Sequence, residues 1–156
     1  MRDVVLGIGN ILLRDEGIGC HVVHALEEIP LPDVEIIDGG TCPDVVQSLE
    51  DVSRLIVVDA ARGGGMPGQI YRFHLDEIAI EPKSFLSIHD MGLVENLMLM
   101  RLLHGMDDTV IIGVEPKEIE WGLELSRELQ DKIPRIIEAV LAELNGSRNR
   151  KGEVKC

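Results

Sequence analysis

Acidic side chains and one histidine stand where short apolar runs of the sequence end. Asp15 and Glu16 come after residues 4–9, Asp38 after residues 34–37, and Asp59 after residues 55–58, while His89 stands just before a long apolar stretch. If these runs are parallel strands, their carboxyl ends share one edge of a sheet, and the side chains converge there. Carboxylate oxygens and an imidazole nitrogen are suitable ligands for a divalent metal ion. The pattern therefore predicts a metal or acid site at this edge.

A structural interpretation stands beside the functional one for each of these residues. An acidic residue after a strand often caps a helix or closes an Asx turn, and both Asp15 and Asp38 are open to that interpretation. Asp59 precedes small residues, which favours a functional role. His89 taken alone is typical of a capping or hydrogen-bonding residue. The remaining histidines are predicted at helix or strand surfaces: His21, His24, His74 and His104.

The glycines after the first apolar run resemble the start of a dinucleotide-binding loop. In Gly7-Ile8-Gly9 the third glycine of that fingerprint would fall at residue 12, but Leu12 stands there. The loop also carries Asp15 and Glu16, whose charges would repel a pyrophosphate. The glycines instead indicate positive φ angles and close backbone packing.

The cysteines do not form a metal or disulfide pattern. Cys20, Cys42 and Cys156 include no CxxC pair, which predicts free thiols in a reducing compartment. Cys42 could pair with His89 as a thiol nucleophile, but nearby acids would raise the pKa of the thiol and favour an incidental role. No Gly-x-Ser-x-Gly elbow is present.

The charge balance excludes several kinds of partner. The 28 acidic residues outnumber the 15 basic ones, and the net charge is −13. Such a surface repels nucleic acid phosphates and anionic lipid. No apolar run approaches the roughly 18 residues of a membrane helix, and the residues after Met1 lack the apolar region of a signal peptide. We therefore expect a cytoplasmic protein without nucleic acid or membrane partners.

The elements that must position these residues alternate along the chain. Apolar runs predict strands at 4–9, 34–37, 55–58, 69–73 and 109–114, and helical spacing predicts helices over 18–29, 91–103 and 133–144. Most of the strand runs are continuously apolar, which is typical of a parallel sheet covered on both faces. The expected fold is α/β, a three-layer sandwich with a central, mostly parallel twisted sheet and helices on both faces. Residues 1–145 form the single domain, and residues 146–156 are predicted as a flexible basic tail.

An ordered set of short motifs resembles the hydrogenase maturation protease family. The first is Leu6-Gly7-Ile8-Gly9-Asn10-Ile11-Leu12-Leu13-Arg14-Asp15-Glu16-Gly17-Ile18-Gly19, followed by Asp38-Gly39-Gly40-Thr41, Val58-Asp59-Ala60, Ser87-Ile88-His89, Leu93, Gly113-Val114-Glu115-Pro116, Gly122 and Leu125-Ser126. Each motif alone is weak, but their order from about residue 3 to 145 is specific. The resemblance covers nearly the whole chain.

The resemblance implies an α/β peptidase domain that acts as an endopeptidase. Members of the family remove a short C-terminal peptide from the nickel-loaded precursor of a nickel-iron hydrogenase large subunit. The nickel belongs to the substrate, so no permanently bound cofactor is expected, although other divalent metals can occupy the site. Carried over by position, Glu16, Asp59 and His89 contact the metal, and Asp38 is the catalytic residue. Either the metal polarises the scissile carbonyl or a carboxylate such as Asp38 activates water.

Two features of the sequence bear on how far the resemblance extends. Many relatives carry glycine where Pro43 stands, which predicts a different loop shape near Asp38. The Gly63-Gly64-Gly65 segment beside Asp59 is predicted to be flexible and to become ordered on a partner.

The alternative function is a non-catalytic assembly chaperone of the same fold that binds the nickel site without cutting. That protein would keep the metal residues but not need Asp38.

Overall fold

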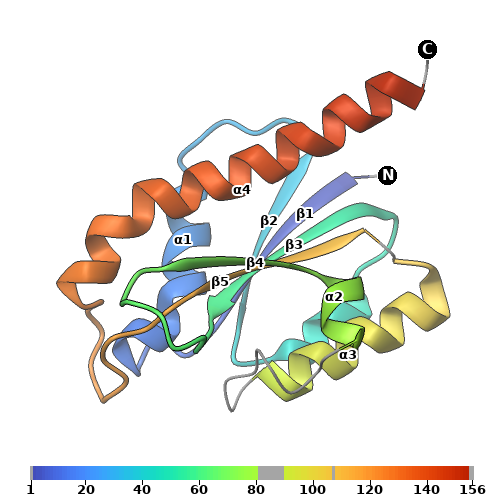
Figure 1. Ribbon diagram of the computed structural model, residues 1–156. Helices are drawn as coiled ribbons and strands as arrows, with labels where there is room; N and C mark the ends of the chain where they lie inside the picture. The colour runs from blue at the N-terminus through green and yellow to red at the C-terminus, as the bar shows by residue number, and fades with distance from the viewer. Residues whose placement is uncertain (1, 81–89, 107, 155–156) are drawn as a thin grey trace.

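The structure is a computed structural model that describes residues 2–80, 90–106 and 108–154. Figure 1 shows strands and helices alternating along the chain. The labels β, α and η denote strands, α-helices and short 3-10 helices. The elements in order are β1 (Arg2–Ile8), η1 (Arg14–Gly17), α1 (Ile18–Leu26), β2 (Val34–Gly40), η2 (Pro43–Ser48), β3 (Val52–Ala60), β4 (Ile70–His74), α2 (Leu75–Ile80), α3 (Asp90–His104), β5 (Thr109–Val114) and α4 (Arg127–Val154).

The strands form one five-stranded sheet in the order β2-β1-β3-β5-β4. β2, β1, β3 and β5 run parallel, and β4 pairs antiparallel with β5 at the edge. β1 and β5 lie inside the sheet and are almost wholly buried, which explains why residues 4–8 and 110–114 carry no polar side chain. The edge strands β2 and β4 are half-buried. The predicted mostly parallel sheet with an edge strand near residues 69–73 is confirmed.

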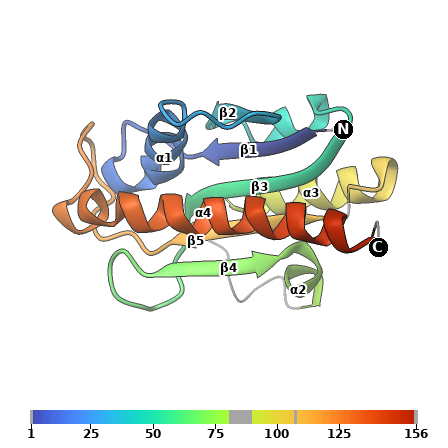
Figure 2. The same ribbon diagram turned by 90° about the horizontal axis from the view of Figure 1, so that it is seen from above.

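Each face of the sheet is covered by its own apolar cluster. One cluster joins α1 and α4 to side chains of β1, β3 and β5, with Val22, Leu129 and Val140 among its fully buried members. The other joins α3 and η2 to the opposite face of the same strands, with Leu97 and Val46 at its centre. Figure 2 shows α4 lying along the sheet with α1 beside it. The three-layer α/β sandwich is confirmed.

Two boundaries differ from the sequence expectation. β2 was expected to end at residue 37 with Asp38 in a turn, but Asp38 pairs with Gly7 within the ladder. The register shifts just beyond this pair, and Gly40 has a φ of +55°, so a bulge at two glycines lets the strand continue past the acid. α4 extends to Val154, so most of the segment predicted as a tail is helical.

None of the helices in the described ranges is long and apolar enough to span a membrane.

Close backbone contact holds α1 against the sheet. A Cβ on Gly19 would overlap the carbonyl oxygen of Val58 and lie 2.5 Å from that of Ile8. We expect Gly19→Ala to lower the free energy of unfolding by about 3 kcal/mol, because the whole helix must move outward. Gly146→Ala is the control: this helical position has open space around it, and alanine there should stabilise by up to about 1 kcal/mol. Urea unfolding of both variants checks the pair, and equal stabilities would contradict this packing.

Candidate active site

The carboxyl ends of β1 and β3 form the topological switch point of the sheet. The chain passes from β1 to β2 through α1 on one face, and from β2 to β3 through η2 on the other face. Open α/β sheets bind their ligands outside the strand ends at such a point. Glu16 follows β1, and Asp59 lies near the end of β3, so both belong to this edge. The structure thus locates two of the candidate residues where the fold favours a site.

Glu16 is buried in η1, and a glycine determines its position. Gly9 has a φ of +151°, and a Cβ there would overlap the carbonyl oxygen of Glu16. A side chain at this position would strain the backbone and displace η1. Because η1 also contacts β3, Glu16 is held beside the ends of β1 and β3. The prediction that the glycines of this loop serve positive φ and close packing is confirmed.

Asp15, next to Glu16, has a structural role. Its Oδ2 accepts hydrogen bonds from the backbone N–H groups of Lys117 (2.9 Å) and Glu118 (2.8 Å) and from the Ser126 hydroxyl (2.7 Å), and its Oδ1 accepts one from the Ser126 N–H (2.7 Å). Burial alone would raise the pKa of this fully buried carboxyl, but the hydrogen bonds outweigh burial and hold the pKa below its ordinary value. Asp15 therefore clamps η1 to the loop between β5 and α4.

Asp59 is a buried carboxylate within β3. It pairs with Gly113 of β5, and its Oδ1 accepts the N–H of Ala60 at 2.8 Å. Side chains alternate along a strand, so Asp59 follows Leu55 and Val57 to the face that α3 covers. The Asp59 carboxylate thus belongs to the same face as the start of α3.

His89, the third predicted metal ligand, lies outside the described residues, as does Cys156. His89 immediately precedes α3 in the sequence. Within residues 2–80, 90–106 and 108–154, no three His, Cys, Asp or Glu side chains are grouped closely enough to hold one metal ion. The convergence of Glu16, Asp59 and His89 therefore stays a prediction.

Asp38 lies in β2 and points to the face that α1 covers. Its Oδ2 is 2.7 Å from Nε2 of His24, and its Oδ1 accepts the Gly40 N–H at 2.9 Å. The buried Cys20, one turn before His24 on α1, donates its thiol to the Gly9 carbonyl at 3.6 Å and lies close enough to lower the pKa of Asp38. The side chain of Asp38 remains 36% exposed, so solvent reaches it. Partners from a helix and from its own strand fix the carboxylate without hiding it.

The surroundings of Asp38 determine its protonation and that of Cys20. Partial burial acts to raise the pKa of Asp38, but the interactions with His24, Cys20 and the Gly40 N–H outweigh it, so the pKa lies below the ordinary value. Burial, followed by the Asp38 carboxylate, raises the pKa of Cys20 to about 12. Cys20 is therefore a neutral thiol and a poor nucleophile, whereas Asp38 is a carboxylate at neutral pH. Cys20 and Cys42 are both free, as predicted.

The sheet keeps Asp38 and Asp59 apart. β1 lies between their strands, so they are separated by two strand spacings, about 10 Å, and they face opposite sides of the sheet. A single ion held by Asp59 cannot also be bound by Asp38. The structure thus has two buried carboxylates, Glu16 and Asp59, near the ends of β1 and β3, and one exposed and oriented carboxylate, Asp38, on β2.

The glycine-rich loop beside Asp59 is fixed by a buried carboxylate that sequence reasoning did not single out for this role. Oε1 of Glu115 accepts hydrogen bonds from the N–H groups of Gly63 (3.0 Å) and Gly65 (2.8 Å) and from the Tyr71 hydroxyl (2.8 Å). These bonds hold Gly63 and Gly65 in place in this structure, and ordering of the loop on a partner stays a prediction. Burial and the Glu115 carboxylate also raise the pKa of Tyr71.

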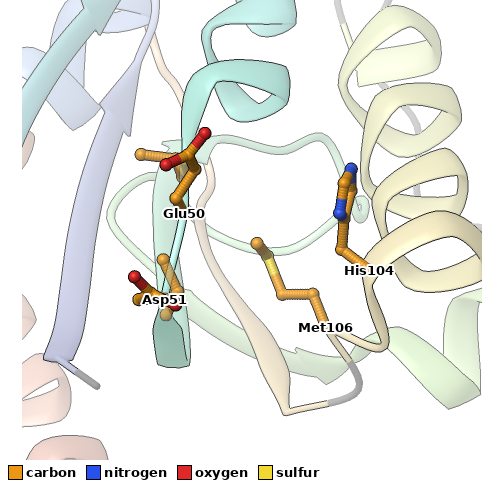
Figure 3. A pocket seen from close by; sticks show the side chains of 6 residues that line it. Glu50, Asp51, His104 and Met106 are labelled. Carbon is orange, nitrogen blue, oxygen red and sulfur yellow. The ribbon is translucent and has the colours of Figure 1, made fainter.

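A cavity of about 350 Å³ lies at the other end of the strands. Leu49, Glu50, Asp51, Val52, His104 and Met106 line it. Figure 3 shows Glu50 and Asp51 on one side of this cavity and His104 and Met106 on the other. It adjoins the start of β3 and the segment before β5, so it is separate from the carboxyl ends where Glu16 and Asp59 lie.

Comparison with known proteins gives one family. The profile described as hydrogenase maturation protease matches residues 20–143. The hydrogenase 2 maturation protease of Escherichia coli K12 is 35% identical over 152 residues, which cover 94% of this chain and 93% of that protein.

Two solved structures share the fold. The hydrogenase maturating endopeptidase HybD from E. coli superposes with a TM-score of 0.82 at 34% identity, covering 94% of each chain. The [NiFe] hydrogenase maturation protease HybD from Thermococcus kodakarensis superposes with a TM-score of 0.78 at 27% identity, covering 91% of this chain and 98% of that one.

Proposed function

Since this chain belongs to the hydrogenase maturation protease family, we propose that it removes a C-terminal peptide from the nickel-loaded precursor of a nickel-iron hydrogenase large subunit. The chain is a protease, and its relatives are hydrogenase maturation endopeptidases. The observation that supports the finer proposal best is that the carboxylates at the strand ends differ in burial and position. Two buried carboxylates lie at the switch point, and an exposed carboxylate lies two strands away.

Glu16 and Asp59, together with His89, bind the nickel that the precursor brings. Oxygen and nitrogen donors of this kind hold nickel without removing it from thiolates. Glu16 and Asp59 are both less than a tenth exposed, and a cation beside them offsets the cost of burying their charges. The nickel is part of the substrate and serves as its anchor. Binding it fixes the scissile bond in register with the protease.

Asp38 acts as the catalytic base. Its lowered pKa keeps it ionised, its exposure admits water, and His24 and the Gly40 N–H orient it. The carboxylate accepts a proton from water as the water oxygen bonds to the scissile carbonyl carbon. It then returns the proton to the leaving amide nitrogen as the C–N bond breaks. The partner is the precursor protein in the cytoplasm, with no nucleic acid or membrane involved.

Cleavage of the cognate precursor, prepared with and without nickel and followed by intact mass, tests this function. We expect a mass loss only in the nickel-loaded sample, because the nickel-free precursor cannot bring its scissile bond into register. Equal cleavage of both samples would contradict nickel-directed recognition. Tight binding of the loaded precursor without any mass loss would favour the non-catalytic chaperone and leave Asp38 without a catalytic role.

A further inference from the structure

Four large apolar side chains are exposed in two loops at the carboxyl end of the sheet. Their exposed fractions are 47% for Ile11, 49% for Leu12, 81% for Trp121 and 64% for Leu123. We call these four residues the apolar tip. Trp121 is the sole tryptophan of the chain. Tryptophan is enriched among the residues that dominate binding at protein interfaces.

The two loops form one built surface, although more than 100 residues separate them in sequence. The Gly122 N–H donates to the Leu12 carbonyl at 2.9 Å, and the Arg14 N–H donates to the Gly122 carbonyl at 3.0 Å. Leu13 and Gly122 form a parallel β-bridge. Figures 1 and 2 both show the loop before α4 at the same end of the molecule as the loop before α1. The apolar tip is therefore presented on a hydrogen-bonded ribbon.

The ribbon continues directly into the proposed nickel-binding turn. Arg14 is both the last ribbon residue and the first residue of η1, which contains Glu16. A Cβ on Gly17 would lie 2.8 Å from the Cα of Ile11, so the base of the tip contacts the end of η1. Asp15 clamps the same turn to residues 117–126 through four hydrogen bonds. A chain seated on the tip therefore lies beside Glu16.

The rim of the tip is acidic. Glu118, Glu120 and Glu124 lie in the same loop as Trp121, and Arg14 forms ion pairs with the first two. The Arg14 guanidinium also donates to the backbone carbonyl of Glu124 at 3.0 Å. Lys117 of the same loop pairs with Glu128, so Arg14 is the cation paired with the rim, and three carboxylates leave an excess of negative charge there. Such a rim complements lysine or arginine next to apolar side chains.

We propose that the apolar tip docks a segment of the precursor in which apolar side chains adjoin lysine or arginine, and so holds the substrate beside Glu16. This role rests on the proposed function and adds a second contact to it, independent of the nickel. Trp121 and Leu12 bury the apolar side chains of that segment, and the glutamates of the rim pair with its basic groups. Docking contributes to substrate affinity and leaves the chemical step unchanged.

Steady-state cleavage of the nickel-loaded precursor by Trp121→Ala, with Leu102→Ala as the matched control, tests the docking role. Leu102 is 82% exposed near the end of α3. The last residue of that helix, His104, lines the cavity at the opposite end of the strands from the apolar tip, so replacing Leu102 should leave KM unchanged. Trp121→Ala should raise KM about tenfold or more and change kcat less than about twofold. Glu124→Lys should also raise KM, because it reverses one rim charge.

Other outcomes contradict the docking role, the basic character of the docked segment, or the proposed function itself. If Trp121→Ala cleaves the precursor with the same KM as the wild type, the apolar tip does not bind the substrate, and the proposed function still stands. A wild-type protein that cuts no loaded precursor would instead fail the proposed function. If sedimentation shows a wild-type dimer that Trp121→Ala converts to a monomer without a change in KM, the tip binds a second copy of this chain. If Glu124→Lys leaves KM unchanged, the precursor segment that docks on the tip does not pair its basic groups with this rim.

Discussion

Asp38→Asn should lower the rate of cleavage of nickel-loaded precursor by at least about 100-fold and leave its binding unchanged. The amide keeps an oxygen that can accept the Gly40 N–H, and it can still hydrogen-bond with His24. It cannot accept a proton from water, so the chemical step alone is impaired. Single-turnover cleavage followed by intact mass gives the rate, and a binding titration gives the affinity. Wild-type cleavage by Asp38→Asn would assign water activation to another group and favour polarisation of the carbonyl by the metal.

The pH dependence provides a second measure of Asp38. Its pKa in the folded protein is lowered, so the base is ionised throughout the neutral range and its acid limb lies below the ordinary value of 3.8. In a preformed complex with nickel-loaded precursor, where His89 is already bound to the metal, the single-turnover cleavage rate should therefore decline with acid only near the folded pKa of Asp38. His24→Gln removes one of the contacts that lower this pKa and should move the acid limb to higher pH. A limb that stays in place in His24→Gln would remove His24 from the orientation of Asp38.

Asp15→Ala should lower the free energy of unfolding by about 4 kcal/mol, the largest loss expected from a single side chain at this end of the sheet. The substitution leaves three backbone N–H groups and the Ser126 hydroxyl without their acceptor. Each bond to a charged acceptor contributes roughly 1.5–3 kcal/mol, and their effects overlap because all four share one carboxylate. Urea unfolding followed by circular dichroism measures the loss.

Ser126→Ala provides the graded control for the clamp. It removes only the hydroxyl bond at 2.7 Å and should cost about 1 kcal/mol. The folded pKa of Asp15 is lowered, so its stabilisation is complete above its ordinary value of 3.8 and is lost as pH falls through the folded pKa. The stability difference between wild type and Asp15→Ala should therefore shrink in acid. A difference that stays constant from pH 6 to pH 2 would show that the charge of Asp15 is not the source of the stabilisation.

The buried strands were predictable from sequence because their composition carries the signal. Residues 110–114 carry no polar side chain, and β5 has the predicted bounds, Thr109–Val114. β2 was harder, since its apolar run stops at Ile37 while the ladder includes Asp38 and Gly39-Gly40. A charged residue within the strand and a bulge that needs glycine both interrupt the pattern that identifies a strand. The strand end predicted from composition, residue 37, is therefore three residues too early.

The candidate site was only partly predictable, because several of its contacts join residues remote in sequence. Asp15 and Glu16 are adjacent acids in one short turn, and only the donors at residues 117–126 distinguish the structural clamp from the candidate ligand. His24 was assigned to a helix surface, and it is largely exposed, yet it contacts Asp38 because the crossover from β1 to β2 lays α1 over β2. The spacing of Cys20 and His24 indicates that they share a helix face. That both lie next to Asp38 follows only from the packing of α1 on β2.

The Asp15 clamp also determines when this end of the sheet can be completed during folding. Its hydrogen bonds span 102 to 111 residues of sequence, and they close the turn that carries Glu16. A nascent chain therefore lacks the complete set of four hydrogen bonds until Ser126 has left the ribosome. We expect these contacts to form after the local contacts of the helices, because loop closure must precede them. Protection of the Ser126 amide from hydrogen exchange during refolding would report when its hydrogen bond to Asp15 forms.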